Sequence, residues 1–219
     1  MIQLRFAVFF AFLICSAADL FAVRTGSTAV ENFAKPLLMP LLIFFYWISA
    51  VGMGKKPEIL ILLALFCGFL GDTFLLLHGG FFLLGLGSFL LGHLCYILAF
   101  LKPLDLHTVP PAVWVSALAY LAFAVFVSKA LLPSVQGREK IAVVLYMACL
   151  LFMSFSALLR CGYVQGKGLE LTFIGSLFFV ASDSMLAFQI YRNAGGVFHV
   201  PVMVTYLLAQ SLIVFGVLQ

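Results

Sequence analysis

Long apolar stretches fill most of the chain, and short polar breaks separate them. Each stretch is about as long as the roughly 20 residues that an α-helix needs to cross a bilayer. The pattern therefore predicts an all-α, polytopic membrane protein with eight transmembrane helices. The predicted spans are Phe6–Val23, Pro36–Met53, Ile59–Leu77, Phe81–Leu101, Ala112–Leu132, Ile141–Leu159, Leu169–Ile190 and Val200–Leu218.

The breaks between the spans are rich in glycine, proline and charged residues, for example at positions 54–57, 78–80, 133–140 and 193–196. Connections this short make neighbouring helices antiparallel. We therefore expect a single domain over residues 1–219, with both termini on the same side of the membrane. The basic residues divide evenly between the two sides, so the positive-inside rule does not decide the orientation.

The composition excludes several classes of protein. Of the 219 residues, 65% are hydrophobic and 9% are charged, whereas soluble domains have about 25% charged residues. The net charge of +4 is spread along the chain, so no nucleic-acid partner is expected. The five cysteines lack metal-site spacing, and we interpret them as apolar residues. The chain is expected in a membrane, the cell or inner membrane in a bacterium.

Three ionisable side chains inside the predicted spans stand out: Asp72, His93 and Asp183. Such residues are costly in a membrane and are by default candidates for a functional site. At about 1.5 Å per residue, Asp72 and Asp183 lie about 8 to 12 Å from the same membrane face, so they could share a pocket. His93 lies roughly 20 Å from that face and could form the floor of this pocket.

Two carboxyl groups in an apolar cavity suit acid–base cleavage of an acetal-like C–O bond. Burial and mutual repulsion keep one group protonated while the other stays ionised. The first then donates a proton and the second stabilises an oxocarbenium ion, as in glycosidases.

Two other chemistries have weaker support. Ser182 and Ser184 flank Asp183, but no nucleophile-elbow motif surrounds them. His78, His93, His107 and His199 lack metal-ligand spacing, although His93 and His199 could converge with the two aspartates. We therefore expect neither a metal nor another cofactor.

Further polar residues lie near these groups. Lys35, Arg192 and His199 fall at the rim of the same face, and Tyr206 and Gln210 fall on the last span between the levels of the aspartates and His93. A lone tyrosine, serine or glutamine in a membrane is more often an interhelical hydrogen-bond partner than a catalyst. The two aspartates are the stronger candidates, because no lysine or arginine inside a span neutralises them.

Five short motifs, in this order and spacing, resemble the YhhN family of membrane lysoplasmalogenases. They are KPLLMP at 35–40, LGD at 70–72, GHLCY at 92–96, SDSMLA at 182–187 and YLLAQ at 206–210. The resemblance implies hydrolysis of the vinyl-ether bond of a lysoplasmenyl-phosphocholine or -ethanolamine in the bilayer. The products would be a fatty aldehyde and the glycerophospho-headgroup.

The implied reaction agrees with the chemistry expected of paired carboxyl groups. Asp72 and Asp183 would be the catalytic pair, in either order of acid and base. The side chains of His93, Tyr96, Ser182, Tyr206 and Gln210 would bind the substrate or position the reacting groups. Lys35 and Arg192 would meet the phosphate.

The alternative is a small proton-coupled transporter or a lipid-binding membrane protein, in which the buried carboxylates carry protons. Asp72 and Asp183 occupy corresponding helices of the two halves of the chain, but the residues around them agree only loosely. No pair of broken helices marks a transport site.

Overall fold

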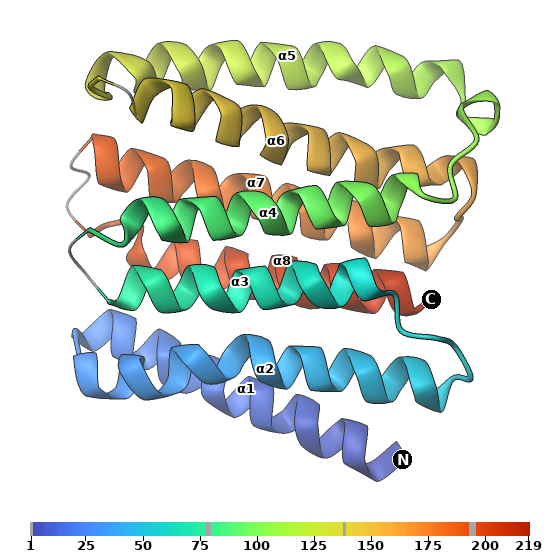
Figure 1. Cartoon of the computed structure of the whole chain (residues 1–219), viewed down its shortest axis with the longest axis horizontal. Coiled ribbons are helices and arrows are strands. Elements are labelled where there is room, and N and C mark those ends of the chain that lie inside the picture. Colours follow the sequence, from blue (N-terminus) through green and yellow to red (C-terminus); the bar gives the residue numbers. More distant parts are fainter. Residues whose placement is uncertain (1, 78–79, 138, 193–195) are drawn as a thin grey trace. The chain divides into compact units, whose positions relative to one another are not determined.

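The computed structural model describes residues 2–77, 80–137, 139–192 and 196–219, and in these ranges eight helices are long and apolar enough to cross a membrane (Figure 1). This confirms the predicted all-α membrane class. The helices are α1 (Ile2–Thr25), α2 (Thr28–Gly52), α3 (Ile59–Leu76), α4 (Phe82–Leu101), α5 (Pro111–Leu131), α6 (Glu139–Leu159), α7 (Lys167–Tyr191) and α8 (His199–Leu218). Short 3-10 turns η1 (Leu106–Thr108), η2 (Leu132–Ser134) and η3 (Arg160–Gly162) lie in the connections.

The start of α2 differs most from the prediction. This helix begins at Thr28 rather than at Pro36, because the polar stretch before Pro36 is helical. Glu31 and Lys35 lie one turn apart and form an ion pair of 3.2 Å, which stabilises the helix. Polarity before the apolar run therefore marks the first turns of this helix and not a loop.

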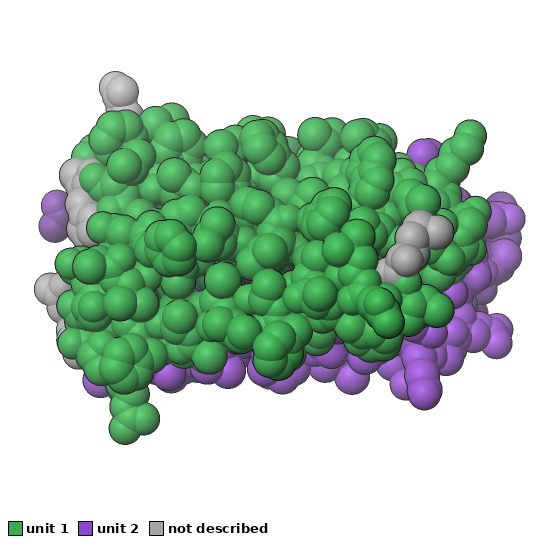
Figure 2. All heavy atoms as spheres, turned by 90° about the horizontal axis from the view of Figure 1, so that it is seen from below, with its two compact units in different colours: residues 1–99, 218 green, residues 100–217, 219 purple. Residues whose placement is uncertain are grey.

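The chain forms two compact units, coloured separately in Figure 2. Unit 1 comprises residues 1–99 and 218, and contains α1 to α3 and most of α4. Unit 2 comprises residues 100–217 and 219, and contains α5 to α7 and most of α8.

Within unit 1, α2 packs against both α1 and α3. Glycines bring α3 and α4 into close contact. A Cβ atom on Gly71 would lie 2.6 Å from the Phe89 ring, and one on Gly92 would lie 3.2 Å from the carbonyl oxygen of Ala64. Small residues allow such an approach between helices in a membrane. Gly71 precedes Asp72, so this contact also fixes the helix turn that carries the aspartate.

Within unit 2, α6 packs against α5 and α7. Small residues again allow α7 and α8 to approach closely. A Cβ atom on Gly175 would lie 2.9 Å from the carbonyl oxygen of Ala209 and 2.9 Å from the backbone nitrogen of Ile213. Nearer the other end of α7, the Ser182 hydroxyl donates to the carbonyl oxygen of Val202 on α8, at 3.0 Å. These contacts hold the segment of α7 that carries Asp183 against α8.

Candidate functional site

Asp183 is the best defined of the predicted site residues. It lies on α7, eight residues before the helix ends at Tyr191, which corresponds to about 12 Å along the axis. The hydroxyl of Tyr146, on α6, donates a hydrogen bond to Oδ2 of Asp183 at 2.5 Å. The aspartate is partly exposed rather than sealed in the core. Its carboxyl group is thus anchored, and the residue is not fully buried.

Tyr206 on α8 belongs to the same neighbourhood. It lies within electrostatic range of the Tyr146 hydroxyl, and its ring packs edge-on against Phe179 of α7, with 5.6 Å between the ring centroids. Ser182 is 1% exposed, and its hydroxyl is used in the bond to α8. We name Tyr146, Ser182, Asp183 and Tyr206 the Asp183 cluster. The cluster brings together side chains of α6, α7 and α8. The predicted positioning role of Tyr206 requires that it lie near Asp183, as a member of this cluster does.

Gln210 lies one turn after Tyr206 and is 1% exposed. Its side chain therefore belongs to the interior of the protein and not to the lipid-facing surface. A buried amide in a membrane needs hydrogen-bond partners, so Gln210 suits contacts between helices. Its role in positioning substrate stays a prediction.

In unit 1, Asp72 is 3% exposed and lies on α3, four residues before the helix ends. His93 and Tyr96, on α4, are each 1% exposed. The register of the glycine contacts places Gly92 opposite Ala64 and Cys67, so His93 lies about seven residues, or about 11 Å, deeper than Asp72. This agrees with the greater depth predicted for His93. The shared pocket of Asp72 and Asp183 stays a prediction.

Lys35 lies among acidic groups of unit 1. Its Nζ atom bonds to Glu31, and Asp19 of α1 lies within electrostatic range of both residues. Asp19 is fully buried, and neither of its carboxylate oxygens has a hydrogen-bond partner. The sequence reasoning missed Asp19, although it falls inside the first predicted span. Lys35 is already engaged by an acid, so a phosphate would share its ammonium group with Glu31.

The remaining predicted residues lie at the ends of helices. Arg192 is exposed just beyond α7, and His199 is exposed at the start of α8. His78 lies outside the described residues. Within the described ranges, no three His, Cys, Asp or Glu side chains form a group suited to a metal ion.

A second buried polar cluster in unit 2 was also missed. The hydroxyls of Tyr120, Ser154 and Ser176 form a chain with two separations of 2.9 Å, linking α5, α6 and α7. Near the opposite end of α7 from Asp183, Arg160 is 6% exposed and donates to Thr172. The positions of polar residues in the sequence do not by themselves distinguish hydrogen bonds between helices from a reactive site.

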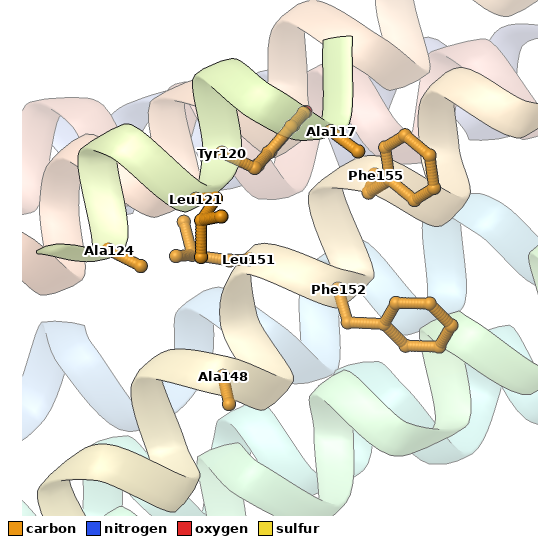
Figure 3. A pocket seen from close by; sticks show the side chains of 8 residues that line it. All are labelled: Ala117, Tyr120, Leu121, Ala124, Ala148, Leu151, Phe152 and Phe155. Atoms are coloured by element: carbon orange, nitrogen blue, oxygen red, sulfur yellow. The ribbon is translucent and has the colours of Figure 1, made fainter. Parts of the chain in front are cut away.

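An apolar groove of about 370 Å³ runs between α5 and α6 (Figure 3). None of the predicted site residues lines it. The lining residues are Ala117, Tyr120, Leu121 and Ala124 from α5, and Ala148, Leu151, Phe152 and Phe155 from α6. The side chains along the groove offer hydrocarbon contacts and no catalytic group.

Eight apolar helices with polar side chains buried between them define an integral, multi-pass membrane protein. The chain belongs to the YhhN family, whose model matches residues 30–217. The matched range includes Asp72, His93, Tyr146 and Asp183, and it begins after Asp19. No curated protein and no solved structure matched the chain. The resemblance drawn from the sequence motifs is therefore confirmed as family membership.

Proposed function

We propose that this chain is a membrane hydrolase that cleaves the vinyl-ether bond of a lysoplasmenyl phospholipid. The observation that carries the proposal is the carboxyl group of Asp183, anchored by Tyr146 inside a membrane span and left partly exposed. Membership of the YhhN family and the second intramembrane acid, Asp72, support it. Acidic groups in a membrane are costly and are commonly kept for function.

The reaction consumes one water and needs acid–base catalysis. A carboxylic acid protonates the β-carbon of the vinyl ether, which converts the C=C–O group to an oxocarbenium ion. The partner carboxylate stabilises this cation and takes a proton from the attacking water. The resulting hemiacetal breaks its C–O bond to the glycerol oxygen, which receives a proton. The products are a fatty aldehyde and a glycerophospho-headgroup.

The other residues would support this chemistry without reacting. Tyr206, Ser182 and Gln210 in unit 2, and His93 and Tyr96 in unit 1, would orient the carboxyl groups or the water. Arg192 is exposed near the end of the span, where a lipid phosphate is expected. Lys35 is a second candidate for the phosphate. The substrate and the membrane are the expected partners.

The test is aldehyde release from a lysoplasmenyl lipid by the purified full chain in detergent, beside the saturated-ether and acyl analogues and with a chelator added. We expect cleavage of the vinyl ether alone, unchanged by the chelator. Asp72→Asn and Asp183→Asn should each lower turnover by about 10²- to 10⁴-fold. Asp105→Asn is the matched control, because Asp105 is exposed and outside the membrane spans.

Full activity in either intramembrane variant would refute the proposed roles. Folded protein that cleaves none of the three lipids would refute the proposed activity. Proton-coupled uptake into liposomes by such inactive protein would instead favour the transporter.

A further inference from the structure

Lys35 lies close to two acidic side chains in the hairpin of α1 and α2, and it forms an ion pair with one of them, Glu31. We propose that Lys35 is a shared counter-ion, whose ammonium group exchanges between Glu31 near the membrane face and Asp19 in the interior of unit 1. The exchange decides whether this ammonium group is presented to a lipid phosphate. That consequence rests on the proposed function, whereas the exchange itself does not.

The first argument is that Asp19 and Lys35 lie at the same depth. Asp19 lies six residues before α1 ends, and Lys35 lies seven residues after α2 begins, so each is about 9 to 11 Å from the turn that joins the two helices. The helices pack against each other, and Lys35 lies within electrostatic range of Asp19. Glu31 lies four residues, or about 6 Å, nearer the turn. A lysine side chain is long and flexible, so its ammonium group can move between two such acids while the backbone stays in place.

The second argument is that Asp19 needs a counter-ion. It is fully buried, and among the described residues neither of its carboxylate oxygens has a hydrogen-bond partner. A buried carboxylate without a compensating charge or donor is unfavourable in its ionised form. An ion pair with Lys35 removes this cost.

The third argument is that Glu31 can release Lys35 at little cost. The side chains of Lys35 and Glu31 are 12% and 26% exposed, and the two residues lie one turn apart on the same helix. Partly exposed pairs of this kind contribute little to stability. The gain at Asp19 is opposed by the lost hydration of the ammonium group as it moves inward. These opposing effects allow both pairings, and the structure holds the one with Glu31.

A double-mutant cycle in the full chain, followed by thermal unfolding in detergent, tests the exchange without any substrate. In the wild type, Asp19→Asn should keep or raise the Tm, because Lys35 is held by Glu31. In a Glu31→Gln background Lys35 is free to pair with Asp19, so Asp19→Asn should now lower the Tm by about 2 °C or more.

Glu170→Gln is the matched control background. Glu170 is also an acidic residue in the first turn of its helix, α7, and it is exposed. With Glu170→Gln, Asp19→Asn should act on the Tm as it does in the wild type.

Steady-state kinetics with the lysoplasmenyl lipid test the consequence for the phosphate. Glu31→Gln should raise KM by about 3- to 10-fold, because Lys35 is withdrawn to Asp19, and adding Asp19→Asn should return KM toward the wild-type value. If Glu31 only shares Lys35 with the phosphate, Glu31→Gln keeps or lowers KM, and this result would overturn the withdrawn state.

The two proposals fail in different ways. If Asp19→Asn changes the Tm equally in the wild-type and Glu31→Gln backgrounds, Lys35 does not exchange, even in an active enzyme. If the effect on the Tm changes sign as expected but no lipid is cleaved, the exchange holds and the hydrolase does not.

Discussion

The close approach of α7 and α8 at Gly175 allows a quantitative prediction. A Cβ atom there would lie 2.9 Å from two backbone atoms of α8, those of Ala209 and Ile213. Ordinary contacts begin at 3.4 Å, so the helices would have to separate by about 0.5 Å (3.4 minus 2.9). Backbone atoms cannot rotate away as a side chain does. Gly175→Ala should therefore strain the interface.

The expected loss combines two opposing effects. Overpacking of this kind costs about 1 to 3 kcal/mol, and alanine returns about 0.5 to 1 kcal/mol through its higher helix propensity. The difference is a net loss of about 0 to 2.5 kcal/mol, centred on about 1 kcal/mol, and 1 kcal/mol corresponds to a decrease in Tm of about 2 to 4 °C for a chain of this size. Gly87→Ala is the control, because nothing lies within 4 Å of its Cβ position, and it should keep or slightly raise the Tm.

Thermal unfolding in detergent measures both variants. The chain has five cysteines outside disulfides, all of them partly buried, so a thiol-reactive fluorophore reports unfolding as these side chains become accessible. Equal Tm values for Gly175→Ala and Gly87→Ala would mean that α8 does not approach α7 as closely as described. A lower Tm for Gly175→Ala alone would support the contact that holds α7 against α8.

Two further substitutions test the buried charges of each unit by the same thermal assay. Asp19→Asn should keep or raise the Tm, because a buried carboxylate whose oxygens lack hydrogen bonds is destabilising when ionised. A lower Tm for this variant would contradict the prediction. Arg160→Lys should lower the Tm by about 2 to 8 °C, since lysine keeps the charge but loses the planar contact with the Phe100 ring at 5.3 Å and the bond to Thr172. A Tm equal to that of the wild type would mean that charge alone matters at Arg160.

The helices could be predicted from the sequence because membrane spans depend on the length of the apolar run. Most boundaries agree within two residues, as at α7, predicted to start at Leu169 and observed from Lys167. The start of α2 was wrong because Glu31 and Lys35 neutralise each other on one helix face. A charged residue beside an apolar run therefore does not indicate a loop where, as here, a residue of opposite charge lies one helix turn away.

The candidate site was only partly predictable. Asp183 and Asp72 were identified because a charged group is rare in a span, but Tyr146 was not, since a tyrosine in an apolar run gives no such signal. Its importance comes from a partner 37 residues away, which only the fold places beside it. Asp19 is also an ionisable residue inside a predicted span, like Asp72, but it was not identified as a candidate.

The hairpin of α1 and α2 has a consequence for how the protein enters the membrane. An aspartate at the centre of a span costs about 2.5 to 3.5 kcal/mol on insertion, and Asp19, which lies six residues before the end of α1, carries a smaller cost of the same kind. Lys35 of α2 lies within electrostatic range of it, and only Gly26 and Ser27 separate the two helices. We therefore expect α1 to leave the translocon together with α2, because Lys35, which also pairs with Glu31, then offsets part of the charge of Asp19.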